Sequence, residues 1–342
     1  MRKNAVIQAM AVAGLIASAP VAHAASTLVF CSEGSPAGFD PGMYTTGTDF
    51  DASAETLFNR LTQCERGGTA VIPGLAEKWE VSEDGLIYTF HLRPGVKFHT
   101  TDYFKPSRDF NADDVLFTFA RASGEGSDMK SYTNDVKEVR KVNDFTVDVE
   151  TKGPFPILPD VLSLLYIVSK KWSEENQSTR PVDRRKGIEN AASFRANGTG
   201  PFRLRERQPN VKTSFVRNGN YWGKIEGNVV NVEYTPIGND STRVAALLSG
   251  QVDVIEPVPL QDVARINAGG KTKVMQGPEL RTIFLGMDQM RDELLYSDVK
   301  GKNPFKDAKV RKAFYQAIDI EAIKSKIMRD LSTPASLLLA PP

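Results

Sequence analysis

The residues best suited to chemistry in this chain form one short segment, Tyr44-Thr45-Thr46-Gly47-Thr48-Asp49. The segment offers a tyrosine and three threonine hydroxyls for hydrogen bonding, and a glycine whose backbone a ligand can approach closely. A helix is expected to follow, and the free N–H groups at its start suit a carboxylate or a carbonyl. The chemistry indicated is non-covalent binding, with an ordinary surface loop as the alternative.

Groups that could catalyse a reaction are few. Beyond the first residues the histidines are His91 and His99, and no HExxH or cysteine–histidine cluster accompanies them, so no metal site is indicated. Neither a Gly-x-Ser-x-Gly elbow nor a Gly-x-x-x-x-Gly-Lys phosphate loop occurs. The sequence therefore favours a binding protein without a cofactor over an enzyme, and a hydrolase stays the enzymatic alternative.

The chain has two cysteines, Cys31 and Cys64. In an oxidising compartment they could form a disulfide, which in the chain-entropy model would add about 3 to 4 kcal/mol of stability. Two unpaired thiols are the equal alternative, because spacing does not establish that the side chains meet. As catalytic nucleophiles they lack a histidine partner in the sequence.

The first 24 residues have the form of an export signal. Arg2 and Lys3 give a basic start, residues 5–19 an apolar core, and Ala22-His23-Ala24 a small-x-small cleavage site, so we expect cleavage after Ala24. No cysteine follows the site directly, which favours a soluble periplasmic protein over a lipid-anchored one. No other segment is apolar for long enough to span a bilayer.

Charge is nearly balanced along the chain. There are 43 basic and 42 acidic residues, and removal of Arg2 and Lys3 leaves 41 basic residues. This balance argues against nucleic acid as a partner. The basic cluster Arg184-Arg185-Lys186 lacks aromatic neighbours that could stack on bases and is interpreted as a solvated loop.

Regular elements are predicted on both sides of the binding segment. Tyr88, Phe90 and Leu92 alternate with polar residues as in a half-buried strand. Asn111 is expected to cap a helix, and residues 136–151 to form a hairpin that turns at Asn143-Asp144. Residues 161–168 form an apolar run that indicates a buried helix or strand.

The elements nearest the binding segment come from distant parts of the chain. A strand is predicted at residues 27–31, ahead of the segment, and Asp51 is expected to cap the helix behind it. Residues 241–249 predict a helix that ends at Gly250 and leads into a strand at residues 252–255. At the end of the chain, Asp319 is expected to begin a helix.

The text from Pro73 to Ala122 closely resembles the signature region of family 5 extracellular solute-binding proteins, the peptide receptors of bacterial ABC importers. Gly198-Thr199-Gly200-Pro201-Phe202 resembles the point where members of that family return from a small second domain to the first. By this resemblance, residues 202–235 rejoin the sheet begun by residues 27–31. The sequence KVRKAFYQAIDIEAI at residues 309–323 resembles the start of the family's third domain.

The resemblance implies an α/β fold with the two-lobed, type II-like architecture of periplasmic binding proteins and an extra small domain. The implied divisions are a signal peptide at 1–24, a first lobe from 25–58 and 198–275, a small second domain at 59–197, and the start of a third domain at 276–342. Members of the family are usually longer. The third domain is therefore expected to be incomplete, and the chain as written to bind peptide weakly or not at all.

The resemblance also implies the function. A monomeric receptor would enclose a di- or oligopeptide between its lobes and dock on the membrane subunits of an importer. The segment from Tyr44 to Asp49 resembles the family's cleft loop on the first lobe. Some relatives carry nickel chelates or haem, so these ligands are the alternatives, together with a fragment that does not bind.

Overall fold

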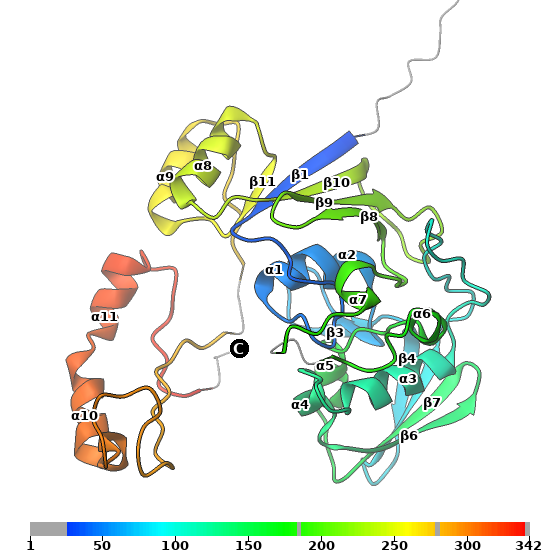
Figure 1. The fold of residues 1–342 in the computed structure, drawn as a ribbon, viewed down its shortest axis with the longest axis horizontal. Helices are drawn as coiled ribbons and strands as arrows, with labels where there is room; N and C mark the ends of the chain where they lie inside the picture. Colours follow the sequence, from blue (N-terminus) through cyan, green and yellow to red (C-terminus); the bar gives the residue numbers. More distant parts are fainter. Residues whose placement is uncertain (1–25, 183–185, 278–280, 339–342) are drawn as a thin grey trace, which may run out of the picture.

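The computed structural model describes residues 26–182, 186–277 and 281–338, and Figure 1 shows their arrangement. The predicted signal peptide at 1–24 lies outside the described residues, as do Arg184 and Arg185 of the basic cluster. Among the described residues, no helix is both long and apolar enough to cross a membrane.

The first sheet has five strands in the order β11-β1-β10-β9-β8. Their bounds are β1 Ser26–Ser32, β8 Phe202–Gln208, β9 Lys212–Arg217, β10 Val229–Pro236 and β11 Val254–Glu256. β1 is parallel to both of its neighbours, with Phe30 opposite Tyr234 of β10 and Cys31 opposite Ile255 of β11. The prediction that residues 202–235 rejoin the sheet begun at residues 27–31 is confirmed.

Helical segments cover both faces of this sheet. Successive side chains of β1 point to opposite faces, so the strand contributes to the packing on both sides. Val29 and Cys31 pack with helices α8 (Asp240–Ser249) and α9 (Val263–Ala268). Phe30 joins the cluster on the other face, where the helical segment α1 (Gly47–Asp49), a π-helical turn (Phe50–Ala54) and α2 (Glu55–Leu57) lies. Gly250 ends α8 in the left-handed conformation, as predicted.

The second sheet has the order β4-β5-β7-β6 and lies at the far end of the body in Figure 1. Its strands are β4 Ala76–Val81, β5 Ile87–Leu92, β6 Val136–Asn143 and β7 Thr146–Thr151, and a separate hairpin pairs β2 Thr62–Cys64 with β3 Val71–Pro73. Tyr88, Phe90 and Leu92 are buried on one face, as predicted. The predicted hairpin is present, but it turns at Asp144 and Phe145, one residue later than expected, because Asn143 still pairs with Thr146.

Helices close the core of this second sheet. They are α3 Ala112–Ala122, α4 Lys130–Thr133 and α5 Leu158–Leu162, whereas α6 Lys170–Glu175 and α7 Ala191–Phe194 contribute Trp172 and Ala192 to a separate small cluster of buried side chains. Asn111 caps α3 as predicted, since its side chain accepts a hydrogen bond from the Asp113 N–H at 3.0 Å. The apolar run 161–168 is not one element: α5 ends at Leu162, and Tyr166 forms an isolated bridge with Arg60.

One other expectation differs from the structure, and one of the two alternatives for the cysteines is present. The helix behind the binding segment begins at Gly47 with Thr46 as its N-cap, so Asp51 lies inside the helical segment and does not cap it. The cysteines are free thiols: Cys31 is buried against α8, and Cys64 is exposed on the β2–β3 hairpin. A Cys31–Cys64 disulfide is absent because the two residues belong to different sheets.

The chain returns to the first sheet through Gly198 and Gly200, which pack directly on the end of α2. A Cβ atom would stand 2.1 Å from the Leu57 carbonyl oxygen at Gly198, and 2.5 Å from the Thr56 carbonyl oxygen at Gly200. The Gly200 N–H donates to the Leu57 carbonyl at 2.9 Å. Only glycine allows this close approach of two backbones.

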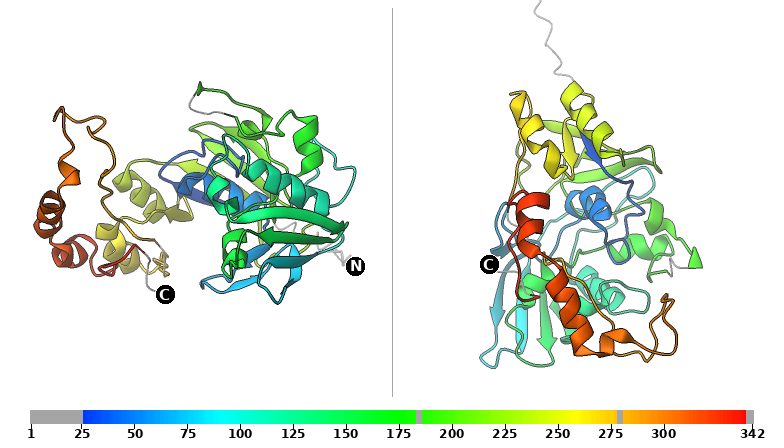
Figure 2. Two further views of the ribbon diagram at one scale, coloured as in Figure 1. Left: turned by 90° about the horizontal axis from the view of Figure 1, so that it is seen from below. Right: turned by 90° about the vertical axis from the view of Figure 1, so that its left-hand side faces the viewer.

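Helices α10 (Ala308–Ala317) and α11 (Ile320–Ala322) lie apart from both sheets, as Figures 1 and 2 show from different sides. Asp319 begins α11, because its side chain accepts a hydrogen bond from the Ala322 N–H at 2.8 Å, as predicted. Neither helix has a buried residue. Large apolar side chains are exposed along this part of the chain, among them Ile283, Phe284, Leu285, Met290, Tyr315 and Ile327.

Candidate functional site

The segment after β1 contains all six predicted binding residues: Tyr44, Thr45 and Thr46 end the loop, and Gly47, Thr48 and Asp49 form α1. Its first half is fixed by Arg207 of β8, whose Nη2 donates to the carbonyls of Pro36 at 2.7 Å and Ala37 at 3.0 Å. The Arg207 guanidinium lies over the rings of Phe39 and Phe194. Strand β8 therefore determines where this loop lies.

Tyr44 points into the protein. Only 3% of its surface is exposed, and its hydroxyl donates to Ser193 Oγ of α7 at 2.9 Å. A Cβ atom at Gly38 would stand 2.3 Å from the Tyr44 ring, so the glycine makes room for the ring. Tyr44 supports the loop from beneath and is not positioned to contact a ligand on the surface.

Asp49 is fully buried and organises the start of the helix. Its carboxylate accepts hydrogen bonds from the Ala37 N–H at 2.7 Å, the Thr46 hydroxyl at 2.7 Å and the Thr46 N–H at 3.3 Å. Thr46 and Asp49 thus form a capping box. A protein carboxylate already occupies this position, which disfavours a ligand carboxylate at the same place.

The outward part of this segment consists of Thr45 and Thr46 of the loop and Gly47 and Thr48 of α1. Thr46 and Gly47 are exposed, Thr45 and Thr48 are half-buried, and the hydroxyls of Thr46 and Thr48 lie 3.1 Å apart. A Cβ atom at Gly47 would meet no atom within 4 Å. This turn therefore presents hydroxyls and an open stretch of backbone to anything that approaches from outside.

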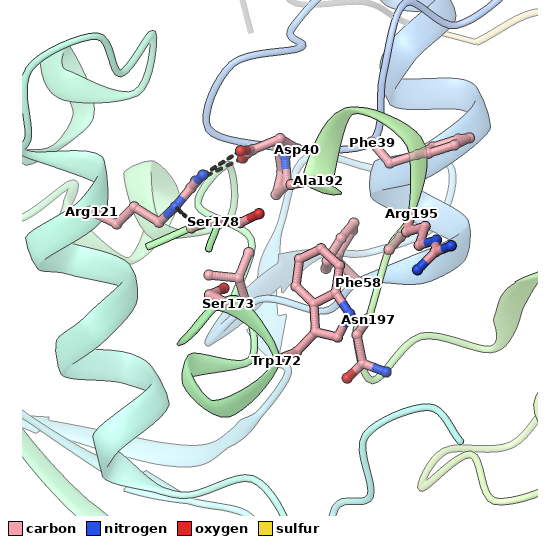
Figure 3. Close-up of a pocket in the computed structure, with 13 residues that line it drawn as sticks. Phe39, Asp40, Phe58, Arg121, Trp172, Ser173, Ser178, Ala192, Arg195 and Asn197 are labelled. Atoms are coloured by element: carbon pink, nitrogen blue, oxygen red, sulfur yellow. Dashed lines mark hydrogen bonds and ion pairs between the residues drawn. The ribbon is translucent and has the colours of Figure 1, made fainter. Parts of the chain in front are cut away.

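A buried ion pair anchors the middle of the loop (Figure 3). Arg121 of α3 donates from Nη1 to Asp40 Oδ1 at 2.7 Å and from Nη2 to Asp40 Oδ2, and its Nε donates to the Ser178 carbonyl at 3.2 Å. Asp40 and Arg121 have 2% and 7% of their surface exposed. The sequence analysis did not identify this pair or Arg207, because no local sequence pattern indicates contacts between residues so far apart in the chain.

The histidines have structural surroundings. His99 is buried, with its Nε2 3.0 Å from the Gly200 carbonyl oxygen and its Nδ1 accepting a hydrogen bond from the Gly198 N–H at 3.4 Å. Burial lowers the pKa of His99 to about 4, so the ring is neutral at pH 7. His91 pairs with Glu80 at 3.4 Å on the second sheet. Within the described ranges, no group of acidic, histidine and cysteine side chains could hold a metal ion.

Comparison with known sequences defines the class of protein. Residues 70–342 match the family described as bacterial extracellular solute-binding proteins, family 5 middle. The chain belongs to this family, which bears out the resemblance drawn from the residues after Pro73. Its α/β fold, with the first sheet shared by the Cys31 and Ile255 segments, is the fold of that family.

Particular relatives differ in their ligands. The di/tripeptide-binding protein 1 of Pseudomonas aeruginosa is 38% identical, over 98% of this chain and 63% of its own length. The heme-binding protein A of Haemophilus influenzae is 31% identical, over 92% of this chain and 57% of its own. The solved periplasmic binding protein DppA of Helicobacter pylori, in complex with the peptide STSA, is 25% identical with a TM-score of 0.75, over 92% of this chain and 61% of its own. The chain spans about three fifths of the length of these relatives.

Proposed function

We propose that this chain is the substrate-binding component of an ABC importer for di- or oligopeptides and acts in the periplasm. The observation that carries the proposal is the 38% identity to a di/tripeptide-binding protein over 98% of the chain. The structure of a relative that holds a peptide supports the same ligand class. In this function the protein captures its ligand without covalent chemistry and delivers it as a monomer to the importer's membrane subunits.

The outward turn Thr45–Thr48 is the part of the first lobe that we assign to ligand contact. Extended peptides offer the same N–H and C=O groups whatever their side chains, and hydroxyls with an open glycine backbone suit such groups. Tyr44 and Asp49 act indirectly, by holding the turn in place. The buried Asp49 carboxylate favours the amide groups or the ammonium end of a peptide over its carboxylate end.

The alternative ligand is haem, favoured by the identity to a heme-binding protein. That identity, 31%, is lower than the 38% to the di/tripeptide-binding protein. Titration with hemin distinguishes the two ligands, because a bound haem gives a Soret band and a peptide does not.

The test uses NMR titration of the isotope-labelled chain with Ala-Ala and Met-Leu dipeptides, since chemical shifts report even weak binding. We expect the amide signals of Thr46, Gly47 and Thr48 to shift. Gly47→Val should abolish the shifts by filling the open space above the backbone. Gly153→Val is the matched control, because a Cβ atom there also meets no atom within 4 Å and the residue lies beside the second sheet. If dipeptides shift other signals but leave this turn unchanged, the assignment of the site is wrong.

A further inference from the structure

Arg207 of β8 joins the loop after β1 to helix α7. Its Nη2 donates to the carbonyls of Pro36 and Ala37, and its Nη1 donates to the Ser193 carbonyl at 3.2 Å. The planar guanidinium can span three such acceptors because its N–H groups diverge in fixed directions. Within the described residues these hydrogen bonds go to the loop and to α7 and not to the outward turn Thr45–Thr48, so any effect of Arg207 on that turn is indirect.

The first connection from Arg207 to the turn runs through one peptide group. The Pro36 carbonyl accepts from Arg207 Nη2 at 2.7 Å. The N–H of the same peptide group, which belongs to Ala37, donates to Asp49 Oδ1 at 2.7 Å. The other carboxylate oxygen of Asp49 accepts from the hydroxyl and the N–H of Thr46. Because a peptide group is planar and rigid, its bond to Arg207 determines where its N–H points, and Arg207 therefore orients the carboxylate that caps the turn.

The second connection runs through Ser193, which is fully buried in α7. Its carbonyl accepts from Arg207 Nη1, and its hydroxyl accepts from the Tyr44 hydroxyl at 2.9 Å. Tyr44 directly precedes the turn. The two connections thus reach the turn at different points, one at Tyr44 and the other at Thr46, and both begin at the same guanidinium.

We propose that Arg207 is a positioning residue of the ligand site. It sets the conformation of the outward turn through the two connections, and through the turn it sets the affinity for peptide. The guanidinium is itself held by its contacts with the rings of Phe39 and Phe194, whose centroids lie 5.6 and 5.7 Å from its central carbon. The effect on affinity rests on the proposed function, whereas the effect on the turn does not.

Amide hydrogen exchange in the ligand-free chain tests the effect on the turn. Arg207→Met keeps an unbranched side chain but removes all of the N–H donors. We expect the Ala37 and Thr46 amides to exchange at least about tenfold faster than in the wild type under conditions in which the chain stays folded. Arg205→Met is the matched control, because Arg205 lies on the same strand with an exposed side chain, and both rates should stay unchanged. Wild-type exchange of both amides in Arg207→Met would overturn the proposal.

Two milder variants keep the test decisive if Arg207→Met does not fold. Arg207→Lys retains the positive charge, but a single ammonium group lacks the fork that reaches both the loop and α7, so we expect a smaller acceleration of both amides. Tyr44→Phe breaks only the connection through Ser193 and should accelerate exchange at Thr46 more than at Ala37. Wild-type rates in both variants would contradict the proposal.

Titration with Ala-Ala, followed by NMR, measures the consequence for ligand affinity. We expect the dissociation constant to rise about tenfold or more in Arg207→Met, less in Arg207→Lys and not at all in Arg205→Met. If Arg207 only stabilised the fold, the urea midpoint would fall while the folded chain kept its wild-type affinity, and that result overturns the proposal. If the wild-type chain does not bind dipeptides, the proposed function fails instead, and the exchange rates alone decide whether Arg207 positions the turn.

Discussion

Replacement of Gly200 by alanine tests the close packing that returns the chain to its first sheet. The new Cβ atom would stand 2.5 Å from the Thr56 carbonyl oxygen and 2.5 Å from the Leu57 carbonyl carbon, well inside normal contact. These are backbone atoms, so no side-chain rotation relieves the overlap. The backbones of α2 and of the 198–200 segment must move apart, and the Gly200 N–H bond to the Leu57 carbonyl at 2.9 Å weakens with them.

The magnitude follows from the two effects. Overpacking of a dense interior typically costs about 1–3 kcal/mol, and loss of a backbone hydrogen bond adds about 1 kcal/mol. We therefore expect Gly200→Ala to lower the free energy of unfolding by about 2–4 kcal/mol. The matched control is Gly153→Ala, whose Cβ atom meets nothing within 4 Å. That change should be neutral or stabilise the chain by up to about 1 kcal/mol, because it restricts the unfolded state.

The assay is urea denaturation followed by tryptophan fluorescence and circular dichroism on the wild-type chain and both variants. We expect the transition midpoint to fall for Gly200→Ala and to stay or rise for Gly153→Ala. If Gly200→Ala unfolds within about 0.5 kcal/mol of the wild type, the range of ordinary surface changes, the packing argument is refuted.

Three further predictions concern buried groups. Arg121→Met should lower the free energy of unfolding by about 3–5 kcal/mol in urea denaturation, because it leaves the Asp40 carboxylate buried and uncompensated. The double variant Arg121→Met/Asp40→Asn should recover part of that loss. A loss below about 1 kcal/mol for Arg121→Met alone would contradict this prediction. The pKa of His99 is about 4 in the folded chain and 6.5 when unperturbed. As the pH falls below 6.5, the unfolded chain therefore binds a proton at His99 that the folded chain does not bind. The free energy of unfolding should decrease between pH 6.5 and pH 4 by up to about 3 kcal/mol. His99→Gln should remove that part of the pH dependence of the urea midpoint. If the midpoint of the variant depends on pH as steeply as that of the wild type, the prediction is wrong. A thiol reagent should modify Cys64 at once and Cys31 only on unfolding, since burial raises the pKa of Cys31; simultaneous reaction of both thiols would be the opposite result.

Local patterns predicted the elements that depend on neighbouring residues. The alternation at Tyr88, Phe90 and Leu92, the Asn111 cap and the Gly250 stop are all present, because side-chain period and capping chemistry act within a few residues. The helix behind the loop was predicted to begin at Asp51, but it begins at Gly47. Thr46 with Asp49 three residues later is itself a capping-box signal, and it identifies the true start.

The candidate site was predictable only in part. Residue types located the loop, but they did not show that Tyr44 and Asp49 turn inward while Thr46 and Gly47 turn outward. That division depends on contacts with residues far along the chain, such as Ser193 for the Tyr44 hydroxyl. The anchoring of Asp40 by Arg121 has the same long-range origin, and no periodicity or spacing within the loop encodes it.

The position of β1 inside its sheet constrains the order of assembly during synthesis. β1 is made before the other strands of its sheet and is flanked by β10 and β11, which are made after them, so one of its edges stays unpaired until Pro236 has emerged and the other until Glu256 has emerged. The second sheet has no such delay, because its four strands come from residues 76–151. We therefore expect this later segment to become ordered before the amino-terminal strand does, which leaves the nascent chain dependent on factors that shield its exposed edge.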